Sequence, residues 1–254
     1  MNLKPIKRLV VVGSFALATA KAVKRRIESE AIKKAYELPD SFTVTAHSGC
    51  NGTKDNTLPS LEEAINSGAD ILEMDIIDDE NGTVLMTHDY EKGKTYPTFE
   101  EGLRFIKEHS DTVKVNVDLK RSHVSFAADE IIHSLGMENR CFFTGVGEED
   151  VPAVAATVSI PYYINIHPSV TEMFDEEYWI SVAAKVNALG GIGVNCKFNL
   201  ITKKGAEICK KNSLLVSVFT PQSDAELSYA LYIEPDNITT RNPEYILSKR
   251  RFKK

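Results

Sequence analysis

The chain has 254 residues, 43% of them hydrophobic, and a formal net charge of −6 at pH 7. A chain of this length and composition can bury a complete core, and one α/β barrel would account for it. Basic residues gather at both ends, with seven lysines and arginines in the first 26 residues and five in the last six, so the body between them is acidic. An acidic body argues against nucleic acid as a partner, because such binding requires positive charge against the phosphates.

Residues 1–40 differ from the rest of the chain. Leu9–Ala20 is an apolar run that follows two basic residues, and Ala18–Ala20 resembles a signal-peptidase site. Twelve helical residues rise about 18 Å, against roughly 30 Å for the hydrocarbon core of a bilayer. We therefore expect a membrane-associating or signal-like helix, whether a short anchor, an interfacial helix or an uncleaved signal.

The basic ends are typical either of contact with an anionic lipid surface or of solvated tails. The first interpretation makes the protein membrane-associated and the second leaves it cytoplasmic. Because Lys21 and three further basic residues follow the apolar run at once, we favour membrane association over export, on a side of the membrane that the sequence leaves open.

The folded body, residues 41–254, begins with a strand and a helix. Phe42–His47 alternates as a strand does and ends on a histidine. After a polar, glycine-bearing loop, apolar residues at helical spacing predict a helix over Leu58–Ser67. A second strand, Asp70–Ile77, comes next, and a short strand candidate, Val84–His88, ends on a second histidine.

Two carboxylates in the second strand are the most informative feature of the sequence. Glu73 and Asp75 are two residues apart, and because side chains alternate along a strand they project to the same face. Two carboxylates that face the same way inside a sheet are costly unless positive charge compensates them, and a divalent cation would do so. His47 and His88, which exchange protons near neutral pH, flank them in the sequence.

Strands and helices then alternate to the end of the chain, beginning with a helix capped by Thr98 and the strand Val113–Lys120. The later strand candidates are Cys141–Val146, Tyr162–Ile166, Gly191–Lys197, Leu214–Thr220 and Asn237–Thr240, and the later helix candidates are Phe126–Leu135, Val151–Thr157, Glu177–Leu189 and Lys203–Lys211. This alternation predicts a single-domain α/β protein with a closed, parallel TIM (β/α)₈ barrel. Nine strand candidates compete for eight places, so either one is the arm of a hairpin at Asn81-Gly82 or the second helix is absent.

The polar residues of these segments form short motifs in a fixed order. They are His47-Ser48-Gly49, Asp55-Asn56-Thr57, Gly68-Ala69-Asp70, Glu73-Met74-Asp75, His88-Asp89, Asn116-Val117-Asp118-Leu119-Lys120, Phe219-Thr220 and Thr240-Arg241-Asn242-Pro243. The series resembles the glycerophosphodiester phosphodiesterase family, which shares a TIM-barrel fold with phosphatidylinositol-specific phospholipases C. The resemblance is specific over residues 42–120 and looser to residue 247.

The resemblance implies a metal-dependent phosphodiesterase that hydrolyses glycerophosphodiesters to glycerol 3-phosphate and an alcohol, with a part in lipid and glycerol metabolism. It implies Ca²⁺ or Mg²⁺ as the metal. The implied metal ligands are Glu73, Asp75 and Asp118, and the implied general acid and base are His47 and His88. The positions that correspond to phosphate- and substrate-binding residues are Ser48, Asp55, Lys120 and Phe219.

The sequence departs from the family pattern at four places. Ser48 stands where the family has an arginine that holds the substrate phosphate. A hydroxyl cannot make the bidentate charged contact of an arginine. The positive charge of Lys120 would partly replace that arginine. Asp55 and Asp118 stand where the family has glutamates. The family insertion after the second histidine is nearly absent. Two alternatives therefore stay open: lyase-type cleavage of a lipid phosphodiester, and a barrel that binds lipid head groups without turnover.

Overall fold

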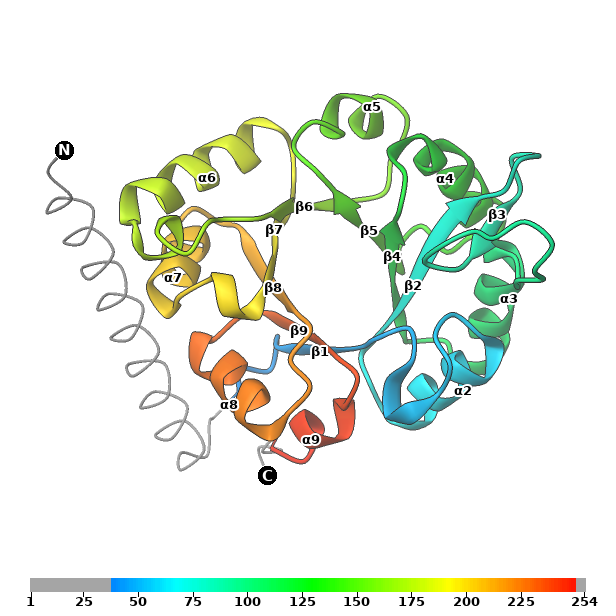
Figure 1. Cartoon of the computed structure of the whole chain (residues 1–254), viewed down its shortest axis with the longest axis horizontal. Helices are drawn as coiled ribbons and strands as arrows, with labels where there is room; N and C mark the ends of the chain where they lie inside the picture. Colours follow the sequence, from blue (N-terminus) through cyan, green and yellow to red (C-terminus); the bar gives the residue numbers. More distant parts are fainter. Residues whose placement is uncertain (1–37, 250–254) are drawn as a thin grey trace, which may run out of the picture.

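The computed structural model describes residues 38–249 (Figure 1). The apolar run Leu9–Ala20 and the helix expected there lie outside the described residues, as do the last five residues of the basic C-terminus. Within the described part, no helix combines the length and the hydropathy needed to cross a membrane.

Eight parallel strands form a closed barrel (Figure 1). The barrel strands are β1 (Thr43–Ala46), β2 (Ile71–Asp78), β4 (Lys114–Leu119), β5 (Cys141–Val146), β6 (Tyr162–Ile166), β7 (Gly193–Lys197), β8 (Leu215–Phe219) and β9 (Asn237–Thr240). Strand β1 pairs in parallel with both β2 and β9, which closes the sheet on itself. The expected TIM barrel is confirmed.

The ninth strand candidate is the arm of a hairpin. Strand β3 (Val84–Met86) pairs antiparallel with the end of β2, outside the barrel order. The turn between them contains Gly82, whose φ of 82° lies in the left-handed region that favours glycine. Asp79 accepts hydrogen bonds from the backbone of Asn81 and Thr83 within the turn. Of the two alternatives left by the sequence, the hairpin is the correct one.

Helices surround the barrel (Figure 1). They are α2 (Leu58–Asn66), α3 (Phe99–His109), α4 (Ser125–Ser134), α5 (Val151–Ala155), α6 (Glu176–Ala188), α7 (Lys203–Lys211), α8 (Asp224–Ile233) and α9 (Pro243–Leu247), with the 3₁₀ turns η1 (Cys50–Gly52), η2 (Ser122–Val124), η3 (Glu172–Phe174) and η4 (Phe198–Leu200). The sequence interpretation missed α8 and α9. Helix α8 begins at a capping box in which Ser223 and Glu226 bond each other's backbone N–H groups, a local signal present in the sequence.

The two faces of β2 differ in polarity. Met74 of β2 packs toward α3, with its sulphur 3.1 Å from the position that a Cβ on Gly102 would occupy. Glu73 and Asp75, on the opposite face of the same strand, therefore point into the barrel. The apolar core lies between the strands and the helices, and the inside of the barrel holds the polar side chains.

Candidate active site

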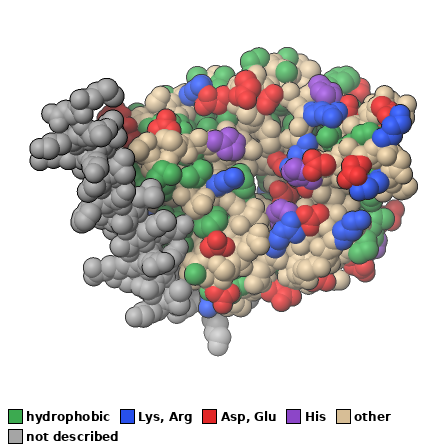
Figure 2. All heavy atoms as spheres, viewed as in Figure 1, with side chains coloured by type: hydrophobic (Ala, Val, Ile, Leu, Met, Phe, Trp, Pro, Cys, Tyr) green, Lys and Arg blue, Asp and Glu red, His purple; other side chains and the backbone are tan. Residues whose placement is uncertain are grey.

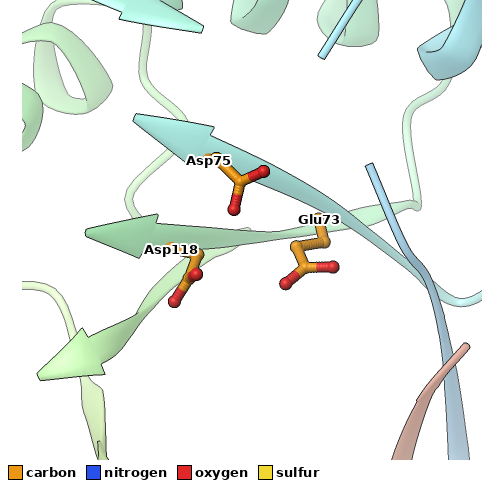
Figure 3. Close-up of side chains that lie close together, drawn as sticks. All are labelled: Glu73, Asp75 and Asp118. Carbon is orange, nitrogen blue, oxygen red and sulfur yellow. The ribbon is translucent and has the colours of Figure 1, made fainter. Parts of the chain in front are cut away.

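Three carboxylates meet inside the barrel at β2 and β4. The parallel pairing of these strands places Asp75 beside Asp118 in register. Glu73 lies two residues earlier on the same face of β2, and the three side chains converge (Figure 3). One oxygen from each lies within 4.8 Å of the others. The structure thus brings together the three residues that the sequence indicated as metal ligands.

Lys120 is the cation nearest to this cluster. Its Nζ lies 2.7 Å from Oδ1 of Asp75 and also forms an ion pair with Asp118. Burial alone would lower the pKa of Lys120, but the two aspartates outweigh burial and raise it. One lysine against three carboxylates leaves a net charge of −2 when all of them are ionised.

Asp75 is held in its charged form. Burial favours the neutral acid, but Lys120 and a hydrogen bond from Asn56 outweigh burial and lower the pKa of Asp75. The Nδ2 of Asn56 donates to Asp75 Oδ2 at 2.7 Å, and the Asp75 N–H donates back to Asn56 Oδ1 at 3.0 Å. Asn56 belongs to the motif Asp55-Asn56-Thr57, but its contact with Asp75 was not expected from the sequence.

Glu73 is the least satisfied member of the cluster. Its Oε2 is the one buried side-chain oxygen or nitrogen of the described chain that has no hydrogen-bond partner. Burial, followed by the charges of Asp75 and Asp118, raises the pKa of Glu73 well above its ordinary value. Burial is also the main cause that raises the pKa of Asp118.

A divalent cation fits this donor set. It would give the orphaned Glu73 oxygen a partner, and it would offset the remaining charge of −2. The three donors are hard carboxylate oxygens, the type that Ca²⁺ and Mg²⁺ prefer. Exposed acidic groups commonly gather without a metal, so the clustering of carboxylates is not enough by itself. The stronger reason to expect a cation here is the buried Glu73 oxygen that has no partner.

His47 follows β1 directly and lies beside the cluster. Its Nε2 is 3.9 Å from Glu73 Oε2. Burial first, and then the positive charge of Arg241, lower the pKa of His47 to about 4. The imidazole is therefore neutral at pH 7 and able to accept a proton.

Ser48 connects His47 to the carboxylates. Its Oγ lies 3.2 Å from His47 Nδ1 and donates to Asp75 Oδ2 at 3.3 Å. A Ser48 hydroxyl that donates to Asp75 can accept from Nδ1–H of His47, which leaves Nε2 as the free acceptor. Ser48 is buried at 3% exposure, so its side chain faces the carboxylates rather than the solvent.

The remaining predicted residues lie farther out. His88 follows β3, and its side chain is 64% exposed and bonded through Nδ1 to Asp89 at 2.9 Å. None of the interactions found among the described residues joins His88 to the carboxylates. Asp55 is bound to Arg241 by two hydrogen bonds, which lower the pKa of Asp55. Phe219 is half-buried at the end of β8.

No protein-family model and no curated protein matches the sequence. Solved structures match it in fold. A Silicibacter pomeroyi protein, provisionally named as a glycerophosphoryl diester phosphodiesterase, matches with a TM-score of 0.71 and 14% identity over 88% of this chain and 99% of its own. An Oleispira antarctica phosphodiesterase, solved in complex with the product sn-glycerol-3-phosphate, matches with a TM-score of 0.64 and 19% identity over 84% of this chain and 96% of its own.

A third match is the glycerophosphodiester phosphodiesterase from Thermotoga maritima, with a TM-score of 0.61 and 18% identity over 82% of this chain and 98% of its own. These structures are covered almost completely, so the likeness extends over a whole barrel rather than a fragment. At such low identity the likeness is one of fold. The chain has the TIM-barrel fold of the glycerophosphodiester phosphodiesterases.

Proposed function

We propose that the protein is a metal-dependent phosphodiesterase that hydrolyses glycerophosphodiesters to glycerol 3-phosphate and an alcohol. The observation that carries this proposal is the orphaned oxygen of Glu73, set among three converging carboxylates and 3.9 Å from a neutral histidine. The fold supports it, and so does the product found in the Oleispira antarctica structure, which indicates that such a barrel can bind a small phosphorylated molecule.

The metal would be held by Glu73, Asp75 and Asp118. Bound there, a divalent cation would stabilise the negative charge that develops on a phosphate oxygen during hydrolysis. Lys120 lowers the pKa of Asp75 and opposes the effect of burial on Asp118, and so favours the ionised state that a metal ligand requires. Ca²⁺ and Mg²⁺ are both compatible with this donor set.

His47 and His88 would share the proton transfers. His47 is neutral at pH 7 and suits the general base that takes a proton from the attacking water. His88 lies on the exposed segment after β3 and would protonate the leaving alkoxide. Ser48 supports the first role because its contact with Nδ1 favours the His47 tautomer that accepts at Nε2.

An assay of the purified protein on glycerophosphodiesters tests the proposal. We expect release of glycerol 3-phosphate with Ca²⁺ or Mg²⁺, loss of this release in EDTA, and rates roughly 10²- to 10⁴-fold lower in His47→Ala and His88→Ala. Arg104→Gln is a suitable control, because Arg104 pairs with Glu100 on the exposed face of α3. Full activity in both histidine variants would refute the proposal.

The same assay separates the two alternatives left by the sequence. Phosphorus NMR of the products would show a cyclic phosphate if the enzyme were a lyase that acts on intact lipid, and an open monoester if it were a hydrolase. A barrel that only binds head groups would retain affinity for glycerol 3-phosphate and release no product from any phosphodiester. We expect the open monoester, because His47 is poised to activate a water molecule.

A further inference from the structure

Arg241 lies at the same rim of the barrel as His47, although the two residues stand at opposite ends of the described sequence. It follows β9 directly, and β9 pairs with β1 so that Thr240 lies beside Ala46 in register. The His47 N–H donates to the Thr240 carbonyl at 2.9 Å, which extends this pairing by one residue. Figure 2 shows acidic, basic and histidine side chains gathered mainly to the right of a hollow near the middle of the view.

The guanidinium of Arg241 is fixed by Asp55 and by the backbone of Gly49. Its Nη1 donates to Asp55 Oδ1 at 2.7 Å and to the Gly49 carbonyl at 3.1 Å, and its Nη2 donates to Asp55 Oδ2 at 2.5 Å. A Cβ on Gly49 would lie 1.9 Å from Asp55 Oδ1 and 2.9 Å from Arg241 Nη1. Only glycine at position 49 allows the ion pair to pack this closely on the loop.

The edge of the guanidinium that Asp55 leaves free suits a phosphate. A guanidinium carries five N–H groups, and the hydrogen bonds found among the described residues use three of them. The two that remain, on Nε and Nη2, lie side by side on one edge of the planar group. Parallel N–H groups of this kind bind two oxygens of one phosphate. The Arg241 side chain is 35% exposed, so solvent and ligand can reach it.

The positive charge of Arg241 acts on His47 and on the carboxylates of the candidate active site. After burial, Arg241 is the largest cause of the lowered pKa of His47, and the carboxylates of Glu73 and Asp75 in turn contribute to the raised pKa of Arg241. Lys120, by contrast, is engaged by Asp75 and Asp118. Arg241 thus brings positive charge with spare donors next to His47.

We propose that Arg241 binds the phosphate of the substrate through its Nε and Nη2 groups, and that Asp55 is the positioning residue that aims it. This inference rests on the proposed function for the identity of the phosphate. It assigns the phosphate contact to the residue that follows the closing strand β9. Ser48, the second residue after β1, faces Asp75 instead.

Binding of glycerol 3-phosphate, measured by calorimetry in the presence of Ca²⁺, tests the proposal without relying on turnover. We expect Arg241→Gln to weaken binding roughly 10- to 100-fold, because it removes two charge-assisted hydrogen bonds. Arg241→Lys should lose less affinity, since it keeps the positive charge but lacks the two parallel N–H groups of the guanidinium. Asp55→Asn should lose the least affinity, since the guanidinium of Arg241 remains and is only held less firmly in place. Arg104→Gln should bind as the wild type does.

A purely structural role for the ion pair makes a different prediction. If Asp55 and Arg241 only anchored the loop after β1, then Arg241→Gln and Asp55→Asn would weaken binding equally and in step with their loss of thermal stability. That result would overturn the proposal, as would unchanged affinity in a folded Arg241→Gln protein or no measurable binding by the wild type. Should Arg241→Gln fail to fold, Arg241→Lys provides the test. Weaker binding of glycerol 3-phosphate by Arg241→Lys than by the wild type would support the proposal, and equal binding would overturn it.

The outcome for Arg241 is separable from that for the enzyme activity. A wild type that binds glycerol 3-phosphate through Arg241 but hydrolyses no glycerophosphodiester would refute the proposed function and leave the Arg241 assignment standing. An active wild type whose KM and kcat are both unchanged in Arg241→Gln would do the reverse. We expect the KM to rise more than the kcat falls, because the contact binds the phosphate and does not transfer a proton.

Discussion

The inside of the barrel has a charged half and a neutral half. On the side of β2 and β4, Glu73, Asp75 and Asp118 face one another with Lys120 among them. On the side of β6 to β9 and β1, amides and hydroxyls of the inward face bond one another. The neutral pairs are Asn195 Nδ2 to Asn165 Oδ1 at 3.0 Å, Asn237 Nδ2 to Ser217 Oγ at 3.1 Å, and Thr45 Oγ1 to Asn237 Oδ1 at 2.9 Å.

The two halves differ in how completely their polar atoms are satisfied. The neutral pairs bond one another and need nothing from outside the chain. The charged half leaves the Glu73 oxygen without a partner and carries a net charge of −2 when all three carboxylates are ionised. Buried polar groups that lack partners cost free energy, so a protein retains them where a ligand completes the set. The neutral half is thus complete in itself, whereas the charged half has the donor set that could hold a divalent cation.

The largest effect on stability is expected from Lys120→Met, which makes the charged half more negative. Loss of one partner from a buried ion pair costs about 3 to 5 kcal/mol, so the metal-free protein should lose that much free energy of unfolding. Ca²⁺ should restore more stability to Lys120→Met than it adds to the wild type, because the variant has more charge to neutralise. Guanidinium chloride titrations with and without Ca²⁺ measure both quantities; equal stabilisation of the two proteins by Ca²⁺ would contradict the comparison.

A smaller effect is expected from Asn195→Ala, in the neutral half. The variant removes one partly buried hydrogen bond to Asn165, and its free energy of unfolding should fall by about 1 to 2 kcal/mol. Because the three carboxylates that could hold a metal lie on β2 and β4, the affinity for Ca²⁺ should stay the same. Chemical unfolding and calorimetry check the two statements, and a large loss of Ca²⁺ affinity would show that the halves are not independent.

The smallest effect is expected from Asp55→Asn, at the rim between the halves. Hydrogen bonds from Arg241 hold the pKa of Asp55 below its ordinary value of 3.8 in the folded protein. The ion pair therefore contributes fully above the pKa of the unfolded chain, and its contribution is lost as the pH falls through the lower pKa of the folded state. For a pair this exposed we expect up to about 1 kcal/mol.

Unfolding of the wild type and of Asp55→Asn from pH 7 down to pH 2.5 tests this sign. The wild type should be the more stable at pH 7, and the difference should shrink toward zero in acid, because asparagine does not titrate. A difference that grows on acidification would show that Asp55 is held in the neutral form, contrary to the geometry of its ion pair.

Much of the barrel was predictable because its signals are local. Alternation marks the strands, helical spacing marks most of the helices, and the spacing of Glu73 and Asp75 places two carboxylates on one face. The hairpin stayed ambiguous because Asn81-Gly82 shows a turn without showing whether the strand after it joins the barrel. Helix α8 was missed although the capping box of Ser223 and Glu226 is a local signal that the sequence contains.

The site was less predictable where it depends on contacts between distant segments. Arg241 acquires its place beside His47 only because β9 closes the barrel against β1, and no spacing in the sequence reveals that contact. The role of Asn56 was unpredictable for the same reason, since its hydrogen bonds to Asp75 join a loop to the strand β2. The resemblance to a family indicated the three carboxylates that converge, but it could not show that Ser48 turns toward Asp75.

Calorimetric titration of Ca²⁺ and Mg²⁺ into metal-stripped wild type and Glu73→Gln at pH 7.5 tests the central claim most directly. Glu73→Gln preserves shape and removes the charge of the orphaned group, so the metal-free variant should be at least as stable as the wild type. We predict one cation site per wild-type chain and an affinity at least roughly tenfold lower in Glu73→Gln, the loss of one charged ligand. Equal affinities in the two proteins, or no binding by the wild type, would contradict a metal centre at these three carboxylates.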